Sequence, residues 1–253
     1  MTHVLQGLLK QAVSHSPNKV ALHVADTQYT FQQLDQLSNN IAQHFLANNL
    51  TGKQVAYLLP NSIELVLLYL ACFKAGVTAV PINYRLAPAE IQMVLTNCQP
   101  WWLVADSLDK LAQLQLEQTT VSQIFVTDQT DRPDITAFSD LLQPIATQHA
   151  LPEIEANHDS VILYTSGSTG QPKGVVHTHL SLSEAFFHIQ PIAKFNGDSI
   201  MLAAGPIYHA GALAEQLLPI FYYGGMLVLL SQYDRDATIK AFQQYKPTHF
   251  QSN

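Results

Sequence analysis

The sequence predicts an α/β fold built from mostly parallel sheets flanked by helices. Short apolar strands alternate with helical segments along most of the 253 residues. Such alternation is typical of parallel sheets that helices cover on both faces. Hydrophobic residues make up 47% of the chain and charged residues only 12%, so we expect a sizeable core and no extended disorder.

The alternation is clearest before residue 155. Apolar residues recur at helical spacing over 32–48, and a buried strand is expected at 55–59. Ser62 is placed to cap the next helix, over 63–74, and Gly76 to end it. The other segments expected here are an amphipathic helix over 4–13, strands over 20–24, 29–31, 77–82, 101–105 and 124–127, and a helix over 88–97.

Residues 144–159 show little pattern, and we expect them to form a connecting segment over the surface. Beyond it the sequence predicts helices over 181–189, 210–218 and 236–244, strands over 199–203 and 226–230, and the start of a strand in the last residues. We therefore expect a front lobe with its connecting segment over about 1–155 and a second part over 156–253.

The most distinctive stretch is YTSGSTGQPKG at 164–174, between an apolar run and two valines. Glycines let the backbone approach a ligand closely, and successive N–H groups in such a turn form an anion-binding nest. A lysine adds a charge that can follow a phosphate oxygen. The stretch therefore predicts a polyphosphate cradle made of hydroxyls, glycines and one cation: Thr165, Ser166, Gly167, Ser168, Thr169, Gly170 and Lys173.

Two other interpretations of this stretch are weaker. A Walker loop needs Lys directly after Gly and before Ser or Thr, whereas Lys173 follows Pro172 and precedes Gly174. A Walker loop also opens a helix, and the residues after this one look like a strand. Many Gly/Ser clusters are flexible surface loops, but a Pro-Lys-Gly exit between two apolar strands favours the cradle.

YTSGSTGQPKG resembles the phosphate-binding signature of the adenylate-forming (AMP-binding) superfamily, which includes acyl-CoA synthetases, aryl-CoA ligases, luciferases and peptide-synthetase adenylation domains. Residues 29–43 and 74–86 are similar to two further motifs that are mainly structural. The sequence PINYRL at 81–86 favours acyl- or aryl-CoA ligases. The resemblance covers the whole chain but only the front of a family member. It implies an incomplete large N-terminal domain of an acyl-CoA synthetase-like fold, without the later motifs and the C-terminal domain.

The resemblance implies a reaction that uses ATP, Mg²⁺ and CoA: activation of a carboxylic acid to an acyl-adenylate, then transfer to CoA. The loop residues and Lys173 would hold the ATP phosphates, Thr165 would contact Mg²⁺, and Lys173 would also act in catalysis. We expect this fragment to turn over poorly. Two alternatives stay open: a non-catalytic nucleotide-binding or interaction module of the same fold, and an adenylation domain that loads another thiol.

GPIYHAGAL at 205–213 matches the aromatic–histidine motif of the family. The resemblance implies that His209 lines the acyl or carboxylate pocket beside Tyr208. Gly211 and Ala212 would leave room there for an acyl group. A lone histidine is more often structural, but this one follows a predicted strand and heads a predicted helix, where ligand-facing residues gather.

Other candidates receive structural interpretations. His177 and His179 form one His-x-His without a third ligand, which is a weak metal signal. Arg85 is expected to be a solvated or ion-paired loop residue, and Asp234 belongs to a solvated helix start. Cys72 and Cys98 have no metal or C-x-x-C spacing and are expected to be buried free thiols.

The charge and hydropathy of the chain argue against two further classes of protein, those that bind nucleic acids and those that span a membrane. The net charge of −7 argues against a nucleic-acid surface, so the expected partners are the acid, ATP and CoA. No signal peptide is evident, and no apolar run reaches the roughly 20 residues that a membrane span requires. We expect a cytoplasmic protein whose truncated sheet ends on unpaired strands, and self-association could occur through this truncated edge.

Overall fold

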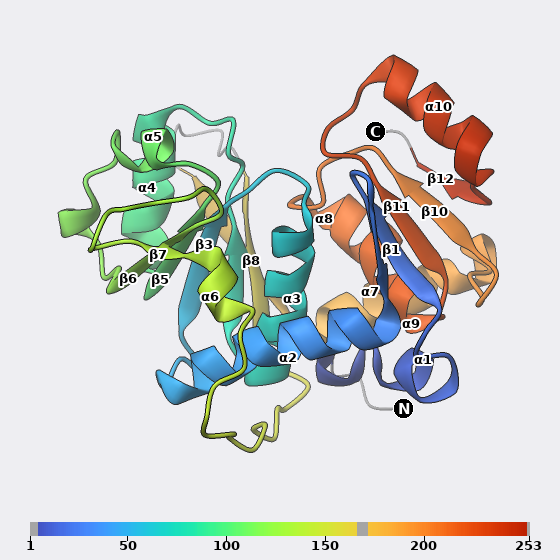
Figure 1. Ribbon diagram of the computed structural model, residues 1–253, viewed down its shortest axis with the longest axis horizontal. Coiled ribbons are helices and arrows are strands. Elements are labelled where there is room, and N and C mark those ends of the chain that lie inside the picture. Colours follow the sequence, from blue (N-terminus) through green and yellow to red (C-terminus); the bar gives the residue numbers. More distant parts are fainter. Residues whose placement is uncertain (1–4, 166–171, 252–253) are drawn as a thin grey trace.

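The computed structural model describes residues 5–165 and 172–251, and its strands form two sheets (Figure 1). The strand order is β7-β6-β5-β3-β4-β8-β9 in the seven-stranded sheet and β12-β10-β11-β1-β2 in the five-stranded sheet. Pairing is parallel except where β2 returns on β1 and β9 returns on β8. The predicted fold class, α/β with mostly parallel sheets flanked by helices, is therefore confirmed.

The strands are β1 (Val20–Val24), β2 (Thr27–Thr30), β3 (Gln54–Leu58), β4 (Thr78–Pro81), β5 (Trp102–Ala105), β6 (Gln123–Val126), β7 (Thr136–Ala137), β8 (Asp159–Thr165), β9 (Lys173–Thr178), β10 (Ile200–Ala203), β11 (Met226–Leu229) and β12 (His249–Phe250). The helices are η1 (Leu5–Gly7), α1 (Lys10–His15), α2 (Phe31–Ala47), α3 (Ile63–Ala75), α4 (Pro88–Cys98), α5 (Leu108–Leu111), η2 (Leu116–Gln118), α6 (Phe138–Leu141), α7 (His179–Ala193), α8 (Ala210–Ala212), η3 (Leu213–Leu217), α9 (Leu218–Tyr222) and α10 (Arg235–Tyr245).

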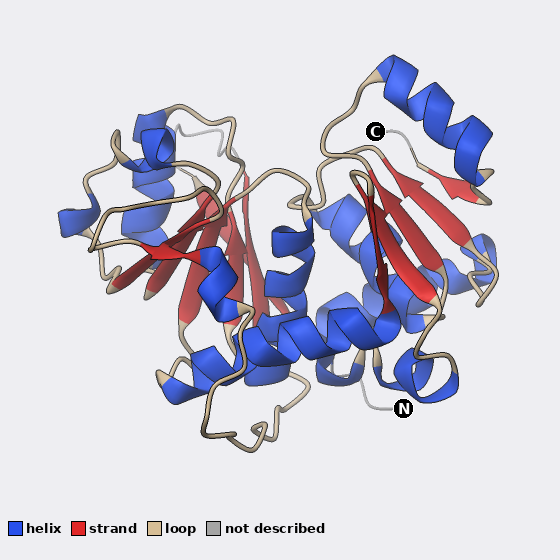
Figure 2. Ribbon diagram, in the orientation of Figure 1, coloured by secondary structure: helices blue, strands red, loops and turns tan. Residues whose placement is uncertain are grey.

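The helices form layers around the two sheets (Figure 2). Helices α2 and α3 lie between the sheets, and the largest core cluster, which includes Phe45, Tyr69 and Phe221, fills this space. Helices α4 and α5 cover the outer face of the seven-stranded sheet, and α10 covers the outer face of the five-stranded sheet. The central cluster takes residues from both sheets, so burial of apolar surface holds the two together.

Helix α3 shows how the sequence determines an element in this central layer. The Ser62 side chain accepts a hydrogen bond from the Leu65 N–H at 3.3 Å, and Gly76 ends the helix with φ 66°, as expected. Every residue from Leu65 to Ala75 is buried. Apart from Lys74, whose ammonium lies 2.7 Å from Asp35 Oδ1, these buried side chains are mostly apolar on all sides, which suits a position between two sheets.

Several boundaries differ from the sequence prediction. The predicted helix over 4–13 is the short η1 followed by α1, and the predicted helix over 210–218 is divided into α8, the π-helical η3 and α9. Helix α7 begins earlier than expected because Thr178 and Ser181 cap each other reciprocally. Strand β7 and helix α6 were not predicted, since their sequences are too short to show a period.

Both sheets draw strands from each side of residue 155. Strands β1 and β2 join β10–β12 in one sheet, while β8 and β9 join β3–β7 in the other. The division of the chain near residue 155 stays a prediction. None of the helices in the described part of the chain has the length and apolar character that a bilayer crossing demands.

Candidate functional site

The residues selected from the sequence lie at the carboxyl ends of parallel strands. Thr165 ends β8, and the loop with Tyr208 and His209 follows β10; Tyr84, which the sequence analysis did not select, follows β4 at the same edge. In open α/β sheets, ligands bind outside the carboxyl ends of the strands. This edge, where the two sheets face each other, is therefore the candidate site.

Strands β8 and β9 form the hairpin that carries the glycine-rich loop. In the antiparallel register, Thr165 faces Lys173 as the last pair before the turn. Both residues are exposed, and Lys173 forms no ion pair with the described residues. The predicted phosphate-contacting residues Ser166, Gly167, Ser168, Thr169 and Gly170 lie outside the described residues. The segment after the turn is a strand, as expected, which excludes the helix that a Walker loop would open.

Gly174 is required by the packing near the loop end of this hairpin. A Cβ at this position would lie 2.8 Å from Ile162 Cγ2 and 3.0 Å from Tyr164 Cζ, closer than real Cβ atoms approach. The absence of a side chain lets the Tyr164 ring lie across the partner strand. The Tyr164 hydroxyl also forms a hydrogen bond with Asn97 Oδ1 on α4. The loop end of the hairpin is thus fixed to the outer helical layer.

The aromatic–histidine loop places His209 at the start of α8. Its ring lies 4.7 Å from the buried Tyr208 ring, centroid to centroid, and its side chain is exposed. Partial desolvation lowers the pKa of the His209 imidazole, which favours the neutral form at neutral pH. A Cβ on Gly211 would meet none of the described atoms within 4 Å, so space is open beside the loop.

Two residues that the sequence analysis did not select hold this loop in place. The buried Asn61 donates to the Gly205 and Leu230 carbonyls and accepts from the Ile207 N–H, each at 2.9 Å. Tyr69 on α3 donates to the Ile207 carbonyl at 3.0 Å. These bonds tie loops of the five-stranded sheet to the β3–α3 segment of the other sheet. An Asn just past a strand end was the only sequence signal for this role.

Tyr84, which follows β4 in the seven-stranded sheet, contacts the loop that follows β10 in the five-stranded sheet. Its ring meets the Tyr208 ring edge to face, with centroids 5.9 Å apart. The Lys110 Nζ lies 4.5 Å from the centroid of the same ring, and Arg85 donates to the Tyr84 hydroxyl at 3.2 Å. Since β4 pairs with β8, this contact brings the carboxyl end of β8 close to the loop that carries His209.

The other candidates have structural roles. Arg85 is exposed and also donates to Gln232 Oε1, so it is hydrogen-bonded and forms no ion pair among the described residues. Asp234 caps α10 as expected, and no group of three metal-ligating side chains occurs within 5–165 and 172–251. Cys72 is buried, but Cys98 is only partly so, which corrects the expectation for that residue; burial raises the pKa of the Cys98 thiol to about 12.

The sequence of this chain matches a known family along nearly its whole length. The profile of the AMP-binding enzyme family matches residues 9–252. The chain is 29% identical over 241 residues to feruloyl-CoA synthase of Amycolatopsis sp., covering 92% of this chain and 45% of that protein. It is 28% identical over 232 residues to the long-chain-fatty-acid–CoA ligase FadD13 of Mycobacterium tuberculosis, covering 90% and 45%. The chain thus spans about 45% of the length of these curated relatives.

Solved structures share the fold. The N-terminal domain of FACL13 from Mycobacterium tuberculosis, determined with an inhibitor, aligns with a TM-score of 0.86 at 26% identity, over 96% of this chain and 61% of that one. The anthranilate–CoA ligase AuaEII, in complex with anthranoyl-AMP, aligns with a TM-score of 0.87 at 22% identity, over 98% and 49%. The two-sheet arrangement described above is therefore one that solved CoA ligases have.

Proposed function

Because the chain belongs to the AMP-binding enzyme family, we propose that it supplies the ATP-phosphate and acid-binding part of an acid–CoA ligase. The observation that carries this proposal is the pairing of Thr165 with Lys173 at the loop end of the β8–β9 hairpin. This pair lies at the same end of the sheets as His209. An exposed lysine without an ionic partner among the described residues is available to an anionic ligand. The names of the two relatives described above, a feruloyl-CoA synthase and a long-chain-fatty-acid–CoA ligase, support the same reaction class.

The proposed first step joins the acid to AMP. A carboxylate oxygen attacks the α-phosphorus of ATP, the bond to the β-phosphate oxygen breaks, and pyrophosphate leaves. Charge builds on the departing phosphates, and the Lys173 ammonium with the loop N–H groups would stabilise it. Thr165 would hold Mg²⁺, which supplies Lewis-acid stabilisation of that charge when bound. A neutral His209 can donate a hydrogen bond to the acid without holding it as an ion pair.

In the proposed second step, a thiolate attacks the acyl carbonyl and AMP leaves. CoA is the acceptor that the relatives' names support, and another thiol carrier remains the alternative. The chain spans about 45% of the length of those relatives, and we expect it to turn over poorly by itself. The proposal places the reaction in the cytoplasm.

Replacing Lys173 with alanine tests the proposed phosphate contact. We expect Lys173→Ala to weaken Mg²⁺-ATP binding about tenfold, the value of one lost charge-assisted hydrogen bond. Calorimetry measures the binding, and ATP–pyrophosphate exchange with a panel of carboxylic acids measures the first step. Lys10→Ala is the matched control, since Lys10 is an exposed lysine on α1.

The outcomes separate the alternatives. Exchange that requires an acid and slows in Lys173→Ala supports the ligase. Slow, acid-dependent exchange is the expected result, and ATP binding with no detectable exchange favours the non-catalytic nucleotide-binding module. Binding and exchange that are both unchanged in Lys173→Ala would remove this lysine from the mechanism.

A further inference from the structure

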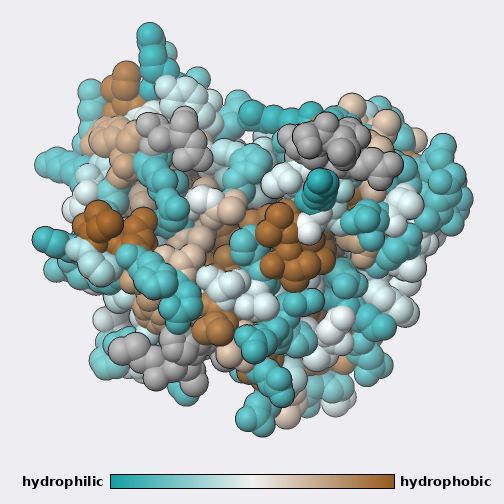
Figure 3. Space-filling model, turned by 180° about the vertical axis from the view of Figure 1, so that it is seen from behind, coloured by the Kyte–Doolittle hydropathy of each residue, from teal (hydrophilic) through white to brown (hydrophobic). Residues whose placement is uncertain are grey.

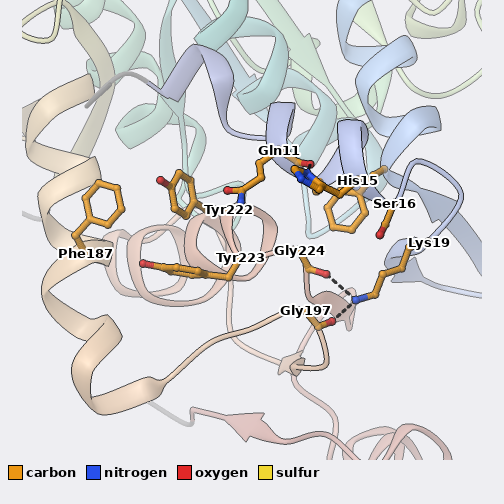
Figure 4. A pocket seen from close by; sticks show the side chains of 11 residues that line it. Gln11, His15, Ser16, Lys19, Phe187, Gly197, Tyr222, Tyr223 and Gly224 are labelled. Atoms are coloured by element: carbon orange, nitrogen blue, oxygen red, sulfur yellow. Dashed lines mark hydrogen bonds between the residues drawn. The ribbon is translucent and has the colours of Figure 1, made fainter. Parts of the chain in front are cut away.

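A separate cavity lies at the opposite, amino end of the five-stranded sheet (Figure 4). Its volume is about 480 Å³, within the range of small-molecule sites. Side chains from α1, α2, α7 and α9 line it, together with the segments that lead into β1, β10 and β11. Gly197 at this cavity shortly precedes β10, and the loop with His209 follows the other end of that strand, so the two sites lie at opposite ends of the sheet.

One wall of the cavity is aromatic. The Phe187 and Tyr222 rings meet edge to face with centroids 5.2 Å apart, and Tyr222 meets Tyr223 in the same way at 5.0 Å. All three rings are partly exposed. Aromatic rings arranged edge to face offer faces and edges on which a further ring can pack favourably.

The facing wall is polar and carries one positive charge. Lys19 donates to the carbonyls of Gly197 and Gly224, the second at 2.8 Å, as Figure 4 shows. An ammonium has three N–H donors, so one remains for another acceptor. The residues that line the cavity include no Asp or Glu, and Lys19 forms no ion pair with the part of the chain that the structure describes.

From this combination we propose that the cavity binds a small aromatic carboxylate as a second ligand, apart from the acid that the proposed ligase would activate. The ring of the ligand packs on Tyr222 and Tyr223, and its carboxylate accepts the remaining Lys19 N–H. The two carbonyls hold the ammonium in place, so little side-chain entropy is lost on binding. Rings also attract cations, but the charge of Lys19 beside them selects against a cationic ligand.

Fluorine NMR of protein labelled with 3-fluorotyrosine tests this site directly. The Tyr222 and Tyr223 resonances are assigned with Tyr222→Phe and Tyr223→Phe, and benzoate is the probe. We expect benzoate to shift both resonances saturably, and benzamide and benzyltrimethylammonium to do so at least tenfold more weakly. The Tyr208 and Tyr84 resonances report the proposed acid site separately, so failure of either proposal is seen independently.

Variants distinguish a specific binding site from general affinity for aromatic molecules. Lys19→Gln keeps donors for the two carbonyls and removes the charge, and we expect it to weaken benzoate binding about tenfold. Tyr222→Leu should weaken it as well, whereas Lys10→Met should leave it unchanged. Folding of each variant is checked by thermal unfolding. The proposal is wrong if benzoate moves neither resonance, if a folded Lys19→Gln binds it equally well, or if the cationic probe binds more tightly.

Discussion

At the scale of single residues, His179 is a core residue, although its His-x-His spacing with His177 is a weak metal-ligand signal. It is fully buried, its Nδ1 accepts the Leu5 N–H at 3.1 Å, and its ring packs against Phe73. Its Nε2 has no hydrogen-bond partner among the described residues. Burial, with a smaller effect of nearby His158, lowers the pKa of His179 to about 4. The folded state therefore excludes the proton that the unfolded chain binds near its ordinary value of 6.5.

The stability of the protein should consequently fall in acid because of this residue. A depressed pKa contributes stability that is fully present above pH 6.5 and is lost as pH falls toward 4, by at most about 1.4 kcal/mol per pH unit. We expect His179→Asn, which keeps an acceptor for the Leu5 N–H, to flatten this part of the profile. Urea unfolding between pH 7 and 4 measures the difference. His188→Asn, at a side chain that is 81% exposed, should leave the slope intact, and equal slopes in all three proteins would refute the assignment.

At the scale of elements, the loop between β10 and α8 depends on neighbours that are distant in sequence. Asn61 and Tyr69 supply hydrogen bonds to its backbone from 138 residues away or more. All these groups are at least partly buried, so an unpaired donor or acceptor would cost free energy. Contacts from the β3–α3 segment and from α3 therefore fix the position of His209 as much as does β10, the strand that precedes its loop.

Removal of Asn61 should loosen this loop. We expect Asn61→Ala to lower the free energy of unfolding by about 2 kcal/mol or more, and Tyr69→Phe by about 1 kcal/mol, because each leaves buried groups unpaired. Hydrogen exchange of the amides at 207–213 should accelerate in both variants. Asn40→Ala is the control, since Asn40 donates to the remote Leu142 carbonyl. Unchanged exchange at 207–213 in a destabilised Asn61→Ala would show that Asn61 supports the fold without positioning the loop.

At the scale of the whole molecule, β9 leaves an apolar edge on the surface. Val175 and Val176 are 45% and 51% exposed, and β9 is the last strand of the seven-stranded sheet. Figure 3 shows that apolar residues gather near the middle of the face opposite to that of Figure 1. An exposed apolar edge strand is a template for pairing with another chain. The self-association expected from the sequence at the truncated sheet edge stays a prediction, and the exposed valines make β9 a further edge where chains should associate.

A lysine on this edge tests that expectation. We expect Val176→Lys to reduce concentration-dependent association, measured by analytical ultracentrifugation, with little change in stability because the side chain is exposed. Thr27→Lys places the same charge on β2, the edge strand of the other sheet, and should have no comparable effect. Equal association of both variants and the unmodified chain would exclude β9 as the contact.

The sequence by itself determined the fold class, the elements with strong caps or periods, and the family. These features depend on local patterns: Ser62 and Gly76 bound α3, and YTSGSTGQPKG is a continuous stretch. Only the tertiary structure decided that Tyr84 meets Tyr208, that Asn61 holds the His209 loop, and that Lys19 faces an aromatic wall. These contacts join residues far apart in sequence, and the pairing of strands into two sheets brings them together. No hydrophobic period or motif spacing in the sequence indicates such a contact.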